Sequence, residues 1–255
     1  MTVLVPSCDA YADILGPFAA LWKRHWPDCP YKTVLLTETK GCDGFGRTIA
    51  TGKGKSWCAM LAEALRQIET DRVMMVLNDY LLEADVDTAL VAKRLEEAKR
   101  HNALNLRLNP NPPGRTPFPD TDLMEMPKNV AYSITCQTGI WDRRFLLGLA
   151  ERNESAWEFE RFGSFMLDPA DPRPLLVART KEFPFVDALH KSYWEREGAA
   201  LCDREGVKAD FKARGFPPLR VRAREALKAA IFAIFPWTLI VRIQNLFSRP
   251  PARPQ

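Results

Sequence analysis

The sequence lacks the features that would place the chain outside the cytoplasm or around a structural metal. Its first 15 residues hold an apolar run of only four, followed by Ser7, Asp9 and Asp13, so neither a signal peptide nor an amino-terminal anchor is expected. The six cysteines form no Cys-x-x-Cys pair and the three histidines are scattered, which excludes the usual zinc patterns and favours reduced thiols. No repeat of fixed period is visible, which argues against solenoids and propellers.

A complete phosphate-binding P-loop is also absent. The stretch from Gly52 to Ser56 ends as such a motif ends, but Ile49 stands where its first glycine should be. Glycine-rich backbone before a helix could still hold a phosphate, with Lys53 or Lys55 adding charge. An exposed basic turn is an equal alternative.

The composition is that of an ordinary globular protein, with its basic charge confined to the end of the chain. The 255 residues are 46% hydrophobic and 27% charged, which suits one large α/β domain with an appendage. The net charge is +4, yet residues 212–255 carry nine Lys/Arg against Glu225 alone. We therefore expect a domain over residues 1–215 and a separate basic tail over 216–255.

Strand-like and helix-like patterns alternate along the first 150 residues. The pattern predicts strands at 3–5, 32–36, 48–50, 72–77, 104–108 and 132–140, and helices at 11–26, 56–68, 87–102 and 142–150. A further helix is expected from Ser155. Residues 109–129 hold six prolines and little periodicity, which is more typical of a lid or binding loop than of a linker. This order predicts an α/β fold with a mixed, mostly parallel sheet flanked by helices.

The most informative stretch runs from Arg72 to Tyr80. Five apolar residues end abruptly at Asn78 and Asp79, as expected of a strand buried on both faces. Ligands of such sheets bind beyond the carboxyl ends of the strands. Asp79 therefore stands where a ligand would bind, although the pair could simply begin a turn.

Two acidic sites compete as the place of a divalent cation. Asp85 and Asp87 form an Asp-x-Asp pair, but they directly precede a helix, where aspartates serve as caps and dipole partners. Asp79 has no neighbouring carboxylate, yet one carboxylate together with a diphosphate can hold Mg²⁺ or Mn²⁺. We expect the cap at Asp87 and the metal, if one is used, at Asp79.

Several short motifs, in order, resemble those of a group of bacterial GT-A-type glycosyltransferase-like proteins of surface-polysaccharide synthesis. The resemblance covers about residues 3–165. The motifs are Val5-Pro6-Ser7-Cys8-Asp9, Lys55-Ser56-Trp57, Leu77-Asn78-Asp79-Tyr80, Leu106-Arg107-Leu108, Gln137-Thr138-Gly139-Ile140-Trp141 and Ser155-Ala156-Trp157-Glu158-Phe159-Glu160. The resemblance implies a GT-A-like, Rossmann-like fold in which a nucleotide-sugar lies across the first strands.

The resemblance also implies roles for individual residues. The nucleotide or donor would contact Pro6, Ser7, Asp9, Lys55, Trp57, Asn78 and Asp79. Asp79 would take the metal or diphosphate position, although the family's acidic motif usually has two carboxylates and Asn78 occupies one place here. The acceptor or sugar would contact Arg107, Gln137, Trp141 and Trp157, although buried core tryptophans are the default.

Two glutamates are candidates for the base that deprotonates the acceptor hydroxyl. In inverting GT-A enzymes this base stands at a helix start, which here offers Glu158 and Glu160. Ser155 with Glu158 three residues later is also a capping box. Glu160 lies about 200° further round the helix and points elsewhere. Both remain candidates, with the preference on Glu158.

The basic tail has the composition of an interfacial membrane anchor. Arg220, Arg222, Arg224 and Lys228 precede thirteen residues, 229–241, that are apolar except for Thr238 and are interrupted by Pro236. That is too short for the roughly 20 residues that span a bilayer. Cationic flanks with Phe and Trp favour an amphipathic helix on anionic lipid, and a helix packed on the body or on a second subunit is the alternative. Nucleic acid is not expected as a partner, because the tail does not interleave basic with polar residues.

Together these features predict a cytoplasmic glycosyltransferase, peripheral on the inner face of the cell membrane. It would move a sugar from a nucleotide donor to a lipid-linked or polysaccharide acceptor, with Mn²⁺ or Mg²⁺ as the cofactor. One alternative is a catalytically silent GT-A-like module that binds sugar or nucleotide in an assembly complex. Another is a different nucleotide-dependent transferase on the same sheet.

Overall fold

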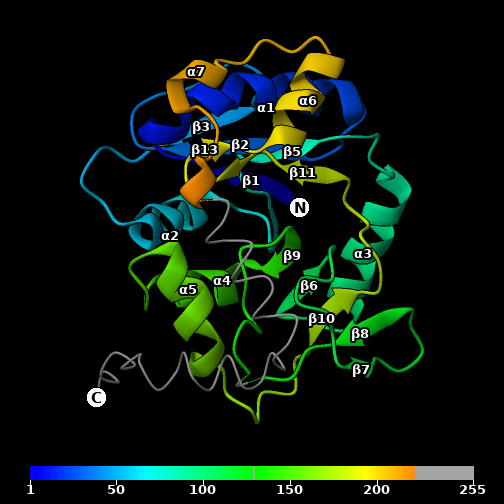
Figure 1. Ribbon diagram of the computed structural model, residues 1–255. Coiled ribbons are helices and arrows are strands. Elements are labelled where there is room, and N and C mark those ends of the chain that lie inside the picture. The colour runs from blue at the N-terminus through cyan, green and yellow to red at the C-terminus, as the bar shows by residue number, and fades with distance from the viewer. Residues whose placement is uncertain (129, 222–255) are drawn as a thin grey trace.

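The computed structural model describes residues 1–128 and 130–221, which form one nine-stranded sheet covered by helices on both faces (Figure 1). The strand order is β3-β2-β1-β4-β9-β6-β10-β8-β7. β9 runs antiparallel to both of its neighbours, and β8 runs antiparallel to β10 and to β7, while the other strands share one direction. The expected fold class, an α/β fold with a mixed, mostly parallel sheet, is confirmed.

The amino-terminal half builds the parallel part of the sheet by strand–helix–strand crossovers. Its elements are β1 (Thr2–Pro6), η1 (Asp9–Tyr11), α1 (Ala12–His25), β2 (Lys32–Thr37), β3 (Arg47–Ala50), α2 (Trp57–Gln67), β4 (Arg72–Met75), β5 (Tyr80–Leu82) and α3 (Thr88–Arg100). The predicted caps are present: Ser56 Oγ accepts from Ala59 N at 3.2 Å, and Asp87 Oδ1 accepts from Leu90 N at 2.9 Å. Asp87 is therefore engaged at a helix start, as expected.

The middle of the chain inserts the antiparallel strand β9 beside β4. The elements are β6 (Asn105–Arg107), β7 (Thr116–Pro117), β8 (Leu123–Glu125), β9 (Gly139–Asp142), α4 (Arg143–Ala150), α5 (Ala156–Gly163), η2 (Ser164–Met166) and β10 (Leu175–Ala178). The predicted strand over 132–140 is wrong, because 130–138 form turns and only 139–142 pair with β4 and β6. The Pro-rich stretch 109–129 contains the short β7–β8 hairpin, which sequence periodicity did not show.

The last part of the described chain packs beside α1, the first α-helix of the fold (Figure 1). Its elements are β11 (Phe185–Asp187), β12 (Leu189–His190), β13 (Tyr193–Trp194), α6 (Arg196–Arg204) and α7 (Phe211–Arg214). In Figure 1, α6 and α7 lie beside α1, far from the β7–β8 hairpin. Arg214 fixes this arrangement, since its guanidinium donates to both carboxylate oxygens of Asp13 at 2.6 Å and lies 4.5 Å from the Tyr11 ring centroid.

Two apolar clusters, one on each face of the sheet, explain why the sequences of the central strands are unbroken apolar runs. Val3, Val5 and Met74 face the cluster formed with α1 and α3, whereas Leu4 and Val73 face the cluster formed with α2, α4 and α5. Successive strand residues point to opposite faces, so a sheet covered on both needs apolar residues at every position.

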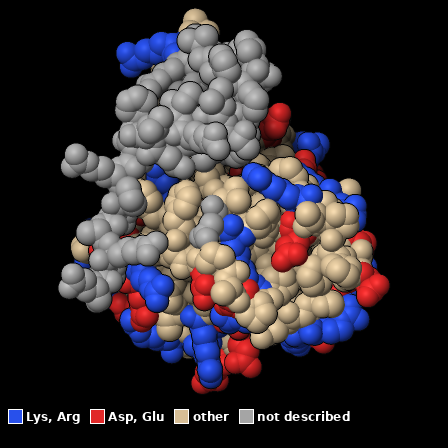
Figure 2. Space-filling model, turned by 90° about the horizontal axis from the view of Figure 1, so that it is seen from below, with Lys and Arg blue, Asp and Glu red and all other residues tan. Residues whose placement is uncertain are grey.

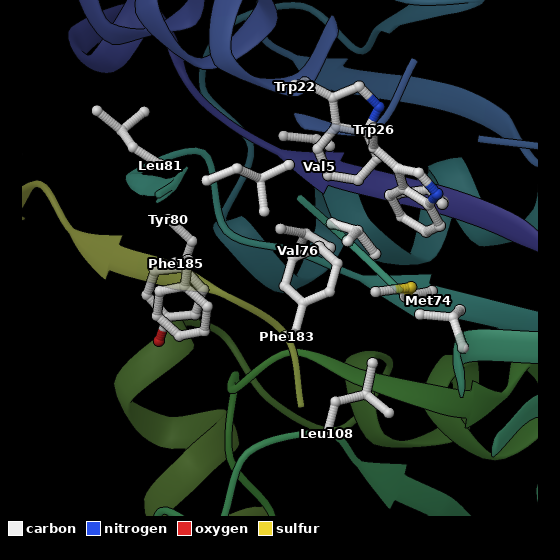
Figure 3. Close-up of a cluster of buried hydrophobic side chains, with 14 of the residues drawn as sticks. Val5, Trp22, Trp26, Met74, Val76, Tyr80, Leu81, Leu108, Phe183 and Phe185 are labelled. Atoms are coloured by element: carbon white, nitrogen blue, oxygen red, sulfur yellow. The ribbon is translucent and has the colours of Figure 1, made fainter. Parts of the chain in front are cut away.

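β11 is joined to the main body by aromatic stacking. The rings of Tyr80 and Phe185 stack with centroids 3.8 Å apart, and Phe183 packs against Trp26 at 5.8 Å (Figure 3). The first contact attaches β11 to β5, the strand that directly follows Asp79, and the second attaches the residues before β11 to the end of α1.

The predicted amphipathic tail, 216–255, lies almost wholly outside the described residues; of it, only 216–221 are described. Among the described helices, none combines the length and apolar character needed to cross a membrane.

Candidate functional site

A cavity of about 1500 Å³ opens at the carboxyl ends of β1 and β4. Its wall includes Pro6, Ser7, Cys8, Tyr11, Trp57, Leu77, Asn78, Asp79, Tyr80, Asn111, Cys136, Gln137, Ala156, Trp157, Glu160 and Asp187, and on its other side residues of 189–197 and 216–221. This is the edge at which ligands of α/β sheets bind. The cavity is therefore the candidate functional site.

The floor of the cavity is set by a hydrogen bond between the ends of two neighbouring strands. Asn78 Nδ2 donates to Ser7 Oγ at 2.8 Å, and the Asn78 side chain is buried. Ser7 directly follows β1, and Asn78 lies three residues beyond the end of β4. Asn78 thus joins the two strand ends, a structural role beside any contact with a ligand.

Asp79 and Asp187 bring two carboxylates into the same cavity from distant parts of the sequence. In the β5–β11 pair, Asp187 lies opposite Tyr80, and Ala188 N donates to the carbonyl oxygen of Asp79 at 2.8 Å. This pairing brings together the segments that carry Asp79 and Asp187, and both residues line the cavity. Asp187 provides the second carboxylate that the Asn78-Asp79 sequence lacks.

Burial and neighbouring charges raise the pKa of both carboxylates. Burial, and next the negative charge of Asp187, raise the pKa of Asp79 to about 7. Burial also raises the pKa of Asp187, which Glu195 and Glu197 raise further while Lys181 and His190 lower it. A cation bound near these carboxylates would favour their ionised forms.

Asp79 and Asp187 are the residues of this cavity that could hold a divalent cation, which would share its coordination with a ligand. Within 1–128 and 130–221, no group of three or more His, Cys, Asp or Glu side chains is arranged to hold a metal. Oxygen donors suit Mg²⁺ and Mn²⁺, and Mg²⁺ is commonly held by one or two carboxylates with waters and phosphates completing the octahedron. Asp79 and Asp187 would supply the two protein oxygens.

Asp9 lies beside the cavity and holds the neighbouring loop. Its carboxylate accepts hydrogen bonds from Thr39 N at 2.9 Å, Thr39 Oγ1 at 2.5 Å and Lys40 N at 2.9 Å. The Thr39 hydroxyl is the largest cause that lowers the pKa of Asp9 to about 2. Asp9 is not among the residues that line the cavity. Its hydrogen bonds hold residues 39–40 against the end of β1.

Lys55 and Trp57 stand at the start of α2 and differ in their relation to the cavity. Trp57 lines it, with its ring edge-on to Phe159 at 5.6 Å. Lys55 forms an ion pair with Glu63 and is not among the lining residues. Lys53 lies 3.8 Å from Asp9 and is largely exposed. The basic turn before α2 thus pairs with acidic neighbours in this structure.

Glu158 and Glu160 have different surroundings. Glu158 completes the capping box, with its Oε2 accepting from Ser155 N at 3.0 Å and its own N donating to Ser155 Oγ at 3.2 Å. Glu160 lines the cavity, and its Oε1 accepts from Cys136 N at 2.6 Å. Burial raises the pKa of Glu160, against the opposing effects of Cys136 and Arg107. The geometry favours Glu160 over Glu158, the reverse of the preference drawn from the sequence.

A second cavity of about 580 Å³ adjoins the first at Glu160. The two share Asn111, Gln137 and Glu160 in their walls. The rest of the second wall comes mainly from 112–115 and 126–135, the Pro-rich stretch and the turns that follow it. Glu160 therefore faces both a large cavity near the paired aspartates and a smaller one under the Pro-rich loop.

The four residues expected to contact acceptor or sugar are divided by burial. Gln137 and Trp157 line the large cavity, and Trp157 is 80% exposed. Trp141 is fully buried, packed on Phe145 and Phe159, which leaves no ring face for a sugar. Arg107 is 1% exposed and lines neither cavity. Direct contact between a ligand and Trp141 or Arg107 is not possible in this arrangement.

Asp187 is the functional candidate that the sequence did not reveal. It ends a three-residue strand and belongs to no recognisable motif. The only signal was an isolated carboxylate after the apolar pair Phe185-Val186. Asp187 reaches the cavity that Asp79 lines through the β5–β11 pairing. No local sequence pattern predicts that pairing.

Charge on the face seen in Figure 2 is mixed. Basic, acidic and uncharged side chains of the described residues are interspersed over it. A nucleic-acid site would show a continuous basic stripe, and this face shows none among the described residues.

Comparison with known proteins gives similarity to solved structures only. No protein-family model matches the sequence, and no curated protein matches it. Solved structures that resemble it include a cytidylyltransferase from Leptospira borgpetersenii serovar Hardjo-bovis (11% identity, 80% of this chain and 94% of that chain, TM-score 0.44) and S. aureus TarS 1-349 in complex with UDP-GlcNAc (13%, 82% and 67%, 0.45). Another is CMP:2-keto-3-deoxy-manno-octonic acid synthetase with CTP (14%, 73% and 92%, 0.41).

Another structure of S. aureus TarS is matched over only 36% of its length. With every TM-score below 0.5, these similarities give the chain neither an activity nor a ligand.

Proposed function

We propose that this protein is a glycosyltransferase that moves a sugar from a nucleotide-sugar donor to an acceptor hydroxyl. The observation that carries the proposal is the pairing of Asp79 and Asp187 in a large cavity at the carboxyl ends of β1 and β4. Such a pair suits a divalent cation that binds the diphosphate of a nucleotide-sugar. With Asp187 present, the lack of a second carboxylate beside Asp79 no longer favours a catalytically silent module.

The large cavity has room for the donor between these carboxylates and the strand ends. The nucleotide would lie over Pro6 and Ser7, with Trp57 at the side and the diphosphate toward Asp79 and Asp187. A cation bound there would neutralise the charge that grows on the diphosphate as the bond to the sugar breaks. Trp157, exposed on the wall, offers an aromatic face to a sugar ring.

Glu160 is placed to act as the base. Its carboxylate would take the proton of the acceptor hydroxyl, whose oxygen then bonds to the anomeric carbon of the donor sugar. The bond between that carbon and the diphosphate oxygen breaks, and the nucleoside diphosphate leaves with the electron pair. The raised pKa of Glu160 suits this role, because a carboxylate with a pKa closer to neutrality is a stronger base.

The second cavity, on the other side of Glu160, would receive the acceptor. A lipid-linked or polysaccharide acceptor at the cytoplasmic face of the membrane is proposed from the sequence of the tail, which would bring the enzyme to anionic lipid.

A thermal-shift panel of UDP-, GDP- and CMP-sugars, each with and without Mn²⁺, tests the proposal. A ligand that binds only the native state raises the melting temperature by mass action, so one nucleotide class should stabilise the protein, and more so with Mn²⁺. A flat response to every nucleotide would refute a donor site. Stabilisation without release of nucleoside diphosphate on adding acceptors would instead favour a binding module.

A further inference from the structure

We infer that Arg107, sealed behind the cavity wall, is a positioning residue that keeps Glu160 ionised and fixes the segment on which its carboxylate rests. This inference rests on the proposed function for its catalytic meaning, but its physical content can be measured without any substrate. It concerns two side chains that never form a direct ion pair in the structure.

Arg107 occupies an unusual position for a guanidinium. It ends β6, which lies between β9 and β10 in the sheet, and it is 1% exposed. Nη1 donates to Asn111 O and to Thr135 Oγ1, each at 3.3 Å, while Nε and Nη2 have no hydrogen-bond partner within the part of the chain that is described. A buried charge with so few partners is costly, so a compensating negative charge is expected nearby.

Glu160 is that negative charge. Burial lowers the pKa of Arg107 to about 10, and the one charged group that raises this pKa is Glu160. The same interaction acts in the other direction, since Arg107 opposes the rise that burial causes in the pKa of Glu160. Each group thus supports the ionised form of the other.

The two side chains also hold adjacent residues of one segment. Arg107 donates to the hydroxyl of Thr135, and Glu160 accepts from the amide of Cys136. The turns at 134–138 are therefore held by the arginine at one residue and by the glutamate at the next. Loss of the arginine would release Thr135 and, with it, the amide that orients Glu160.

Arg107 is the cation that acts on Glu160, whereas Arg161, the next residue on α5, acts on Tyr132. The titratable groups that interact with Glu160 from the packed elements are Cys136, Tyr80 from β5 and Tyr132 from the turns. All three are neutral near pH 7, because burial raises the pKa of each above its ordinary value. Without Arg107, burial alone would favour a protonated Glu160, which cannot accept a proton.

The test is the titration of Glu160 in the full chain, followed by ¹³C NMR of labelled glutamate carboxyls, with Glu160→Gln identifying the signal. Arg107→Met should raise the Glu160 pKa by about 1 to 3 units, the usual effect of removing an opposite charge, whereas Arg107→Lys should keep it within about one unit of the parent protein. Arg72→Met is the matched control, because Arg72 is also buried in the sheet but interacts with Asp142 and Asp71. It should leave the Glu160 pKa unchanged.

An unchanged Glu160 titration in a folded Arg107→Met protein would overturn the inference. If Arg107→Met does not fold, the double variant Arg107→Met/Glu160→Gln decides. The double variant should fold, because the carboxylate left without its cation is gone. An unfolded double variant beside a folded Glu160→Gln protein would show that Arg107 acts on the core independently of Glu160, and would refute the pairing. None of these measurements needs a donor, so failure of the glycosyltransferase proposal leaves them interpretable.

Discussion

The amide of Ala188 donates a hydrogen bond to the carbonyl oxygen of Asp79 at 2.8 Å, and this contact joins the two segments that carry the acidic pair. Asp79 follows the central strand β4, while Asp187 ends β11, and the pairing of β11 with β5 brings both residues to the same cavity. The acidic site is thus a product of strand register and of the Tyr80–Phe185 stack behind it.

The buried Asp79 should make the protein less stable as the pH rises toward neutrality. Its pKa is about 7 in the folded protein against an ordinary value of 3.8, so between these pH values the folded state binds more protons than the unfolded state. The free energy of unfolding therefore falls as pH rises through this window, by at most about 4 kcal/mol at about 1.4 kcal/mol per pKa unit. Asp79→Asn should flatten this dependence in urea unfolding measured from pH 4 to pH 7.

Asp187→Asn tests how much the charge of Asp187 contributes to this pH dependence. Removal of its charge should lower the pKa of Asp79 toward its ordinary value, since Asp187 is the second largest cause of the shift. Part of the pH dependence should therefore disappear without any change at Asp79. A pH profile identical to that of the parent would mean that the two carboxylates do not interact.

Gly198 should be required for the position of Asp187. A Cβ at Gly198, on α6, would lie 2.6 Å from Ala188 Cα and 2.8 Å from its Cβ. Gly198→Ala must therefore move α6 or the end of β11, at a cost of about 1–3 kcal/mol, and should weaken stabilisation of the protein by Mn²⁺ in thermal-shift measurements.

Gly148→Ala is the matched control, because a Cβ at Gly148 on α4 meets nothing within 4 Å. It should be neutral or stabilising by up to about 1 kcal/mol, since alanine favours helix over glycine. Equal effects of the two substitutions would show that the close approach of Gly198 to Ala188 does not position Asp187.

Glu160 and Glu158 should separate catalysis from helix capping. Glu160→Gln keeps an oxygen that can accept from Cys136 N but removes the base, so turnover should fall about 10²- to 10⁴-fold. The melting temperature should fall as well, because buried Arg107 loses its compensating charge. Glu158→Gln retains a capping box and should leave turnover near the parental rate, while Glu158→Ala should cost about 0.5–2 kcal/mol of stability. The reverse pattern, with activity lost in Glu158→Gln and kept in Glu160→Gln, would transfer the role of base to Glu158.

Truncation after Val221 should release the protein from anionic liposomes without harming donor binding. The removed residues, 222–255, include six Lys/Arg and the apolar run 229–241, and each basic residue near such a surface contributes about 1 kcal/mol. Sedimentation with liposomes would measure the loss, and salt should weaken binding of the parent by screening.

Truncation after Arg214 provides the contrast, because Phe216, Pro217 and Val221 line the large cavity. This shorter form should lose part of the nucleotide-induced thermal shift as well. If truncation after Val221 leaves liposome binding intact, the tail is not the membrane anchor, and a lipid-linked acceptor loses its main support.

The parts of the fold that the sequence predicted are those with strong local signals. β1, β2 and β4 appear as apolar runs because both faces of the sheet are covered, and Ser56 and Asp87 mark helix starts by capping chemistry. The capping box of Ser155 and Glu158 was equally visible, since it involves residues three apart. These signals depend on neighbours in sequence, so an isolated sequence is enough to find them.

The parts that escaped prediction depend on distant contacts. Residues 132–138 alternate like a strand, but Tyr132 adopts a φ of 61° and the segment turns, held at Thr135 and Cys136 by Arg107 and Glu160. The sequence alone does not distinguish a polar strand residue that contacts a ligand from one, such as Arg107, that contacts other buried groups. Asp187 has no periodic pattern around it, and it is the pairing of β11 with β5 that places it at the cavity.

Titration calorimetry of UDP, GDP and CMP, each with and without Mn²⁺, on the parent protein and on single-carboxylate variants measures whether a cation held by Asp79 and Asp187 supports nucleotide binding. One nucleotide should bind, and Mn²⁺ should tighten its binding in the parent, while Asp79→Asn and Asp187→Asn should each remove this tightening. Asp85→Asn is the control, because Asp85 is exposed and pairs with His25 at 2.9 Å, and it should behave as the parent. Binding that ignores Mn²⁺, or tightening by Mn²⁺ that survives in Asp187→Asn, would contradict a cation held between Asp79 and Asp187.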